Sequence, residues 1–264
     1  MTKLDLAPKH RLHLAVHNLA ARLHLADLSP VAVVPEGGHY RVTSQGQSLA
    51  VPSARRWIMY RHGYARRFDL LGRQFGLGSI VTLAPGDTVI DVGANVGEFG
   101  LCAAADGVRV FCIEGDPKVF DCLTLNVADR PGIVPLREVV WKAEEDLTFY
   151  SEPSHADSSI IADNSSGRYA PITLRATTLD LLATAQGIGP VALLKCDAEG
   201  AEPEVLQGAT ALLARTAVVA LDTGPERLGQ ETGRDCAAIL TAAGFAVTHE
   251  IRGRRKMTIG RRAA

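Results

Sequence analysis

Short apolar runs alternate with segments of helical period through most of the chain. The runs that predict strands are residues 88–92, 108–113, 133–141, 191–196 and 217–221. The segments that predict helices are residues 97–105, 117–128, 202–214 and 231–243, and a final strand pair covers 245–251 and 256–259. This order predicts an α/β fold with a doubly wound, mostly parallel sheet. The link at 252–254 is too short for a crossover helix, so we expect a reversed terminal β-hairpin.

The first third of the chain has a different pattern. Leu12, Val16, Leu19 and Leu23 recur near helical period and predict an amphipathic helix over residues 9–27. Alternation around Gly46 predicts a hairpin over residues 40–51. A Pro-Gly-Asp turn at residues 85–87 then marks a boundary. We therefore expect an N-terminal extension of helix and hairpin over residues 1–84, which covers a ligand, and a main domain over residues 85–264.

The turn after the first predicted strand carries the clearest chemical signal. Asp91 ends that strand, and Gly93, Ala94, Asn95 and Gly97 follow it. Glycine permits a tight turn and a close approach of backbone to a ligand. An ordinary strand-to-helix turn is the other interpretation. Glu114, at the end of the next apolar run, favours a ligand site, because a carboxylate there can accept both hydroxyls of a ribose.

The composition of this loop indicates which adenosine cofactor it binds. The loop is G-x-N-x-G and lacks the middle glycine of the dinucleotide fingerprint G-x-G-x-x-G. A pyrophosphate would be crowded there, whereas S-adenosylmethionine carries no phosphate. Asp91 and Asn95 can supply polar partners to its amino-acid part. The sequence therefore favours S-adenosylmethionine over a dinucleotide.

Charge and cysteine content narrow the class of protein. Lys and Arg number 28 against 29 Asp and Glu, which offers no broad basic face for nucleic acid. Basic clusters at 55–56, 66–67 and 252–262 are interpreted as solvated surface. The five cysteines form no paired motif, and no apolar run reaches the ~20 residues of a membrane span. We expect a cytoplasmic enzyme with no nucleic-acid or membrane partner and no metal, and a homodimer is one option for its assembly.

Three motifs in this order resemble the FkbM family of S-adenosylmethionine-dependent methyltransferases. They are DVGANVGEF at 91–99, IEGDP at 113–117 and LLKCDAEGAEPEVLQGA at 193–209. The resemblance covers about residues 85–222, and Trp57 to Phe75 resembles the helical lead-in of that family. It implies the class I methyltransferase (Rossmann-like) fold. In that fold Trp141 falls where the adenine is held, although a core tryptophan is an equal interpretation.

Several side chains are candidates for the chemical step, and one of them, Asp197, is also a candidate for cofactor binding. Asp197, Glu199 and Glu202 follow the strand at 191–196, where the ligand of an open α/β sheet binds. A carboxylate or a histidine can accept the proton of an attacking hydroxyl, and His155 lies in a polar loop over 151–167. Some of these acids could instead cap the following helix.

We therefore predict an O-methyltransferase acting on a hydroxyl of a small-molecule acceptor, with sugars and polyketide-type natural products as the substrate classes that the resemblance implies. N-methylation, carboxyl methylation and Mg²⁺-assisted transfer at Asp197, Glu199 and Asp222 stay open. A NAD(P)-dependent oxidoreductase and a non-catalytic binding protein are the alternatives from other classes.

Overall fold

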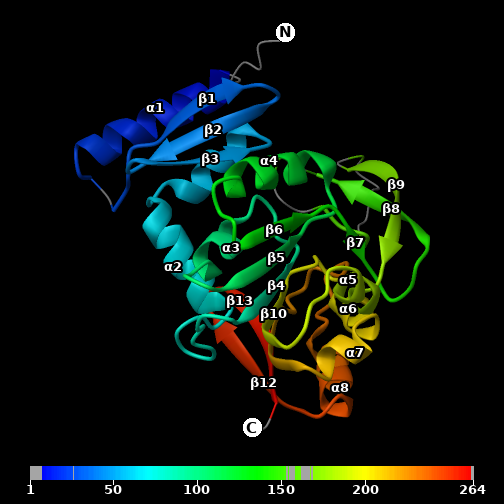
Figure 1. Ribbon diagram of the computed structural model, residues 1–264. Helices are drawn as coiled ribbons and strands as arrows, with labels where there is room; N and C mark the ends of the chain where they lie inside the picture. Colours follow the sequence, from blue (N-terminus) through cyan, green and yellow to red (C-terminus); the bar gives the residue numbers. More distant parts are fainter. Residues whose placement is uncertain are drawn as a thin grey trace.

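The computed structural model describes residues 8–25, 27–152, 154, 158–161, 167 and 169–262. Its centre is a seven-stranded sheet in the order β12-β13-β11-β10-β4-β5-β6 (Figure 1). These strands are β4 (Thr88–Val92), β5 (Arg109–Ile113), β6 (Ile133–Leu136), β10 (Val191–Cys196), β11 (Thr216–Asp222), β12 (Phe245–Arg252) and β13 (Arg255–Arg262). Only β13 runs against its neighbours in this sheet. The predicted doubly wound sheet with a reversed terminal hairpin is confirmed.

Helices cover both faces of the sheet. The helices of one face are α2 (Tyr64–Gln74), α3 (Glu98–Ala103) and α4 (Pro117–Val127), and those of the other are α5 (Leu179–Ala185), α6 (Glu202–Gln207), α7 (Thr210–Leu213) and α8 (Gly233–Ala242). Successive strand residues divide between the two cores: Val89 packs with Phe75 and Leu123, and Ile90 packs with Leu179 and Leu206. This alternation explains why the parallel strands are apolar throughout.

The N-terminal part forms a small layer of its own beside α4. It contains α1 (Pro8–Arg22), the antiparallel strands β1 (Ala32–Glu36), β2 (His39–Ser44) and β3 (Gln47–Val51), and the 3₁₀ helix η1 (Ala54–Tyr60). The predicted hairpin over 40–51 is confirmed. The predicted first helix is shorter than expected and ends at Arg22. The strand β1 was not expected, because its outward positions are mostly exposed and its sequence contains a proline.

One asparagine joins this layer to the main sheet. The Oδ1 atom of Asn126 in α4 accepts from the backbone N–H of Ala50 at 2.6 Å, and its Nδ2 donates to the carbonyls of Ala50 and Val96 at 2.9 Å each. Each polar atom of the side chain is therefore used in the contact between β3, α4 and the glycine turn.

Two segments of the main domain depart from the sequence-based expectation. The predicted strand over 133–141 is two strands: β6 ends at Leu136, and β7 (Val139–Val140) joins β8 (Asp146–Ser151) and β9 (Ala170–Thr177) in a second sheet. The charged pair Arg137-Glu138 lies at the break. The predicted helix over 202–214 is α6 and α7, separated at Gly208, since glycine is a poor helix former.

No helix within the described ranges is long and apolar enough to span a bilayer.

Candidate active site

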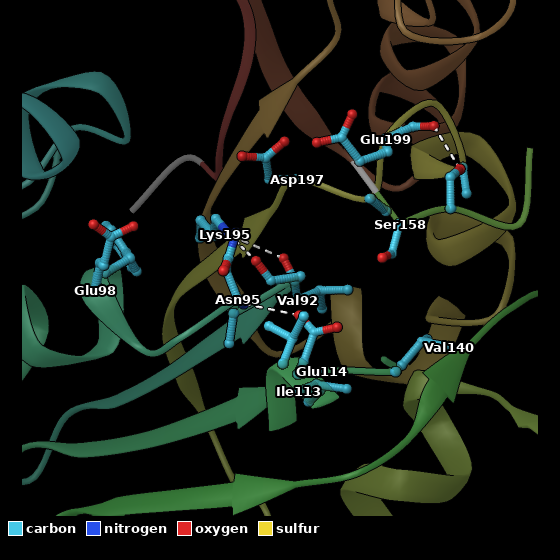
Figure 2. A pocket seen from close by; sticks show the side chains of 18 of the residues that line it. Val92, Asn95, Glu98, Ile113, Glu114, Val140, Ser158, Lys195, Asp197 and Glu199 are labelled. Carbon is cyan, nitrogen blue, oxygen red and sulfur yellow. Dashed lines mark hydrogen bonds between the residues drawn. The ribbon is translucent and has the colours of Figure 1, made fainter. Parts of the chain in front are cut away.

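A cavity of about 230 Å³ opens at the carboxyl ends of β4, β5 and β10. Its lining includes the glycine turn (Gly93, Ala94, Asn95), carboxylates (Glu98, Glu114, Glu138, Asp197, Glu199), basic groups (Arg56, Arg67, Lys195, Arg255), and apolar or small side chains from Met59, Leu71, Phe75, Val140, Phe149, Ser158 and Ser159. Figure 2 shows Glu114 on one side of this pocket and Asp197 with Glu199 on the other. Residues distant in sequence therefore meet at the edge of the sheet where ligands of this fold type bind.

The turn itself is shaped by backbone contact. Gly93 has φ +69°, and a Cβ there would lie 1.9 Å from the carbonyl oxygen of Asp197. Only glycine allows this crossing of the two chain segments. Gly97 has φ +91° but does not line the cavity, and a Cβ there would lie 2.8 Å from Leu123 Cδ1 of α4. Gly93 therefore shapes the cavity, and Gly97 lets α3 begin against α4.

Glu114 is held at the cavity by two backbone donors. Its Oε2 accepts from the N–H of Asn95 at 2.9 Å, and its Oε1 accepts from the N–H of Asp116 at 2.8 Å (Figure 2). Burial raises the pKa of Glu114 to about 7, although these backbone donors and Arg56 act to lower it. A carboxylate has about four acceptor positions, so two remain for the hydroxyls of a ligand.

Asn95 connects the turn to the N-terminal layer. It is a non-glycine residue with φ +53°, and its Oδ1 accepts from the N–H of Val96 at 2.8 Å and from the guanidinium of Arg56. Arg56 is 2% exposed and comes from η1. The arginine thus holds the residue whose own N–H donates to Glu114.

Asp91 and Lys195 form a buried pair below the cavity. Lys195 Nζ lies 2.8 Å from Asp91 Oδ1 and donates to the carbonyls of Val92 and Gly93. Burial acts to lower the pKa of Lys195, but the charges of Asp91 and Asp197 and the hydrogen bond to Asp91 together raise it. Asp91 is fully buried and does not line the cavity. The pair fixes the ends of β4 and β10 relative to each other.

Asp197 lies beside a cationic group. Its Oδ2 accepts from Arg255 Nη1 at 2.9 Å, and the same guanidinium donates to Asp222. Its Oδ1 is buried without a hydrogen-bond partner in the part of the chain that the structure describes. Burial acts to raise the pKa of Asp197, but Arg255, Lys195 and Arg67 together lower it. Asp197 is therefore ionised at neutral pH and has an unused acceptor atom.

The other predicted side chains divide between cavity and scaffold. Glu199 lines the cavity, and its carbonyl accepts from Ser159 Oγ at 2.9 Å. Glu202 is buried outside the lining: its carboxylate accepts from the N–H groups of Ala198 and Gly200 and from Thr232 Oγ1. It shapes the turn after β10.

Trp141 also lies outside the lining, and its indole N–H donates to Glu145 at 3.0 Å, while its neighbour Val140 reaches the cavity. His155 lies outside the described residues. For the Mg²⁺ alternative, the carboxylates that lie close enough to share an ion are Asp197, Asp222 and Glu226, and Glu199 is not in this group. Arg255 already places a positive charge between Asp197 and Asp222.

Three arginines of the site were missed by the sequence interpretation. The basic clusters at 55–56, 66–67 and 252–262 were interpreted as solvated surface, but one arginine of each enters the cavity lining: Arg56, Arg67 and Arg255. Arg67 makes a two-point ion pair with Glu98 at 2.9 and 2.8 Å. Their neighbours Arg55 and Arg66 are exposed. Arg56 lies directly before the buried Trp57, which was the available signal.

Residues 91–247 match the Methyltransferase FkbM domain. That match spans more than half of the chain. The protein belongs to the FkbM methyltransferase family. The predicted family, class I methyltransferase fold and enzyme class are thereby confirmed, and the methyl donor is S-adenosylmethionine.

The hexuronic acid methyltransferase AglP of Haloferax volcanii is 30% identical over 162 residues, which are 56% of this chain. The chain spans 66% of that relative's length, just under two thirds. Among solved structures, Aeropyrum pernix fibrillarin with natively bound S-adenosyl-L-methionine is 13% identical, with 87% of this chain and 98% of that chain covered and a TM-score of 0.43. A precorrin-6y C5,15-methyltransferase from Geobacter metallireducens GS-15 is 10% identical, with coverage of 77% and 89% and a TM-score of 0.42.

The cavity residues fit the methyl donor. Glu114 presents free acceptor positions just after β5, and Gly93 belongs to the cavity lining. The lining carries both acidic and basic groups, which suits a ligand with an ammonium, a sulfonium and a carboxylate.

Proposed function

We propose that this protein transfers a methyl group from S-adenosylmethionine to a hydroxyl of a sugar-type small molecule. The observation that carries the proposal is the buried Oδ1 of Asp197, which has no hydrogen-bond partner among the described residues and belongs to a cavity-lining side chain. An ionised carboxylate accepts hydrogen bonds but donates none, so this atom suits a hydroxyl. The hexuronic acid named for the AglP relative supports a sugar as the acceptor class.

The residues of the site divide between cofactor and acceptor. We assign the ribose hydroxyls to Glu114 and the amino-acid part of the cofactor to the turn formed by Gly93, Ala94 and Asn95. Asp91 and Gly97 support this turn from below. Val140 and Phe149 offer an apolar wall to the adenine, with Trp141 packed behind it as a support.

S-adenosylmethionine supplies an electrophilic methyl group on a sulfonium. Asp197 and Glu199 receive the acceptor on the opposite side of the pocket, where one carboxylate aligns the attacking hydroxyl and accepts its proton as the new bond forms. Arg255 holds Asp197 in place and lowers its basicity. Alignment by Asp197 therefore carries more of the rate than strong base catalysis, and Glu199 is the second candidate for the proton.

The test is methyl transfer to defined sugars. The full-length protein is incubated with methyl-labelled S-adenosylmethionine and with matched acceptors, one neutral hexose glycoside and one hexuronic acid glycoside. A labelled product that resists mild alkali is a methyl ether and supports the proposal. A product that releases labelled methanol in alkali is a methyl ester, which would establish carboxyl methylation instead. Absence of label from both acceptors would argue against a sugar.

The substitution Asp197→Asn tests the site in the same assay. It preserves shape but removes the charge, so we expect turnover to fall by about 10² while S-adenosylhomocysteine affinity changes less than threefold. Arg234→Gln, an exposed change outside the cavity, is the matched control. An equal loss of cofactor affinity and turnover in Asp197→Asn would move this residue into the cofactor site.

A further inference from the structure

A row of aliphatic side chains is exposed along one side of α1. Leu12, Val16 and Leu19 of α1 are 67%, 58% and 58% exposed, and Leu23, which directly follows the helix and donates its N–H to the carbonyl of Leu19, is 57% exposed. They are separated by four, three and four residues, a spacing that places them on one side of a helix. Large aliphatic residues on a helix surface usually face the core, so a continuous exposed row indicates a binding surface.

A different side of α1 attaches the helix to the protein. His17 is buried against Trp57, with ring centroids 4.8 Å apart, and its Nε2 lies 2.9 Å from the carbonyl of Ser29. Ala21 is buried as well, and Leu14 packs on the core of the N-terminal layer. The exposed row is therefore not the side that stabilises the helix on its own chain. In Figure 1, α1 lies on the outside of the small sheet, at the end of the molecule far from β12.

The charges of α1 all have one sign. Pro8–Arg22 contains no Asp or Glu, and it contains Lys9, Arg11 and Arg22. By helical spacing, Lys9 lies beside Val16 on one flank of the row, and Arg11 and Arg22 lie along the other flank. An apolar row between basic flanks is typical of helices that lie in the interface of a membrane with anionic lipids.

We propose that α1 docks on the surface of an anionic lipid bilayer, with its axis in the membrane plane and its aliphatic row inserted at the acyl boundary. A second copy of this chain fits less well, because two such helices would bring basic flanks together. One row of four side chains also falls short of the ~800 Å² per partner that a standard protein interface buries. The proposal replaces the expectation of no membrane partner. That expectation rested on the absence of an apolar run long enough to span a bilayer and on the near-zero net charge of the chain.

Vesicle co-sedimentation of the full chain tests this surface. The probes are vesicles of phosphatidylcholine alone and vesicles of phosphatidylcholine with phosphatidylglycerol at a ratio of about 7:3, at low salt and at high salt. We expect binding to the anionic vesicles only, weakened by salt because the attraction is screened.

Three variants separate the contributions to binding. The quadruple change L12Q, V16Q, L19Q and L23Q should weaken binding at least tenfold. The triple change K9Q, R11Q and R22Q should weaken it by about 100-fold, from roughly fivefold per charge. The matched control is L125Q, L181Q, L228Q and I251Q, four exposed aliphatic residues outside α1, which should bind vesicles as the unchanged protein does.

Other outcomes would overturn the proposal. Equal vesicle binding by the row variant and the unchanged protein would show that α1 is not the contact. Failure of the unchanged protein to bind anionic vesicles would also reject it. If light scattering shows a dimer that the row variant converts to a monomer, the surface is a contact between copies. Unchanged S-adenosylhomocysteine binding by each variant serves as the folding control.

Discussion

At the scale of single residues, the proposed assignment of the ribose hydroxyls to Glu114 makes cofactor binding depend on the charge state of this group. Burial raises its pKa to about 7, so near neutral pH it is divided between the acid and the carboxylate. Only the carboxylate can accept both ribose hydroxyls while it also accepts two backbone N–H groups. We therefore expect S-adenosylhomocysteine affinity to fall by up to about tenfold per pH unit below 7. Titration calorimetry between pH 5.5 and 8.5 measures this dependence.

The stability of the free protein should change with pH in the opposite direction. Between about pH 4.5 and 7 the folded state retains the Glu114 proton that the unfolded chain has released. The raised pKa of Glu114 therefore contributes about 3 kcal/mol to the free energy of unfolding. This contribution is complete below pH 4.5 and is lost as the pH rises through 7. Glu114→Gln should flatten both profiles and weaken cofactor binding by about 2 kcal/mol. If affinity in this variant keeps the pH dependence of the unchanged protein, another group titrates.

Arg56 contacts the proposed cofactor site through its hydrogen bond to Asn95. Without the guanidinium, the side chain of Asn95 loses its cationic partner, although Asn95 has φ +53° and is not a glycine. The backbone N–H of Asn95, which donates to Glu114, is then less well placed. We expect Arg56→Lys to weaken S-adenosylhomocysteine binding about tenfold, because lysine cannot reproduce the planar guanidinium. Arg55→Lys, at the exposed neighbour, is the matched control. Binding equal in the two variants would exclude this positioning role.

The sequence identified local chemistry better than long-range chemistry. Gly93, Asn95 and Glu114, which line the cavity, were selected because each follows a strand in a recognisable turn, whereas Asp91 lies within β4 and outside the lining. Arg56 was not found, because nothing in a pair of adjacent arginines shows which one points inward. Its burial depends on Asn95, which lies 39 residues later in the chain. Trp141 and Val140 show the same limit, since a difference of one residue decides which side chain reaches the cavity.

At the scale of elements, the turn between β4 and α3 depends on how closely β10 approaches it. The Cβ of Gly93→Ala would collide with a backbone oxygen, which a side chain movement cannot relieve. We expect this substitution to lower the free energy of unfolding by about 3 kcal/mol or more, from strain at positive φ plus displacement of the strand ends. Denaturant unfolding measures it.

Two alanine substitutions serve as controls for that prediction. Gly187 has φ +62° and open space around its Cα, so Gly187→Ala measures the cost of positive φ alone, about 1 kcal/mol. Gly97→Ala meets the mobile end of Leu123 and should fall between the two. Equal costs at Gly93 and Gly187 would contradict the steric account.

The elements that sequence predicted well are those with a periodic pattern and a buried face. The strands β4 and β10 were placed to the residue, since each is a short apolar run between turns. The hairpin of β8 and β9 was not expected, because its alternating residues are mostly exposed or half-buried and carry little apolar signal. The helix α5 was missed for a similar reason: it has only seven residues.

At the scale of the whole molecule, the N-terminal part is a wall of the active site as well as an extension. Asn126 ties β3 to α4, and the buried side chains of Leu71 in α2 and of Phe75, which directly follows that helix, belong to the same core as Val89. If the chain were two independent folding units that met at residue 84, this shared core would be divided between them. The boundary at 84–85 therefore marks where the strand–helix alternation begins, and the packing continues across it.

A chain that begins at residue 85 should consequently lose cofactor binding. Without α2, the ring of Phe75 is missing from its edge contact with Phe99 at 5.4 Å and from its place 5.2 Å below Lys195 Nζ. We expect no measurable S-adenosylhomocysteine binding and a lower midpoint of thermal unfolding for residues 85–264. Residues 28–264, which lack α1 but keep η1 and α2, should bind S-adenosylhomocysteine with an affinity within about threefold of that of the full chain.

Because a truncated chain can also fail to fold, Phe75→Ala in the full-length protein tests the same wall. Loss of a buried aromatic side chain lowers the free energy of unfolding by about 3 to 5 kcal/mol, and cofactor affinity should fall with it. Full affinity in both the 85–264 chain and Phe75→Ala would show that the cavity needs no wall from the N-terminal part.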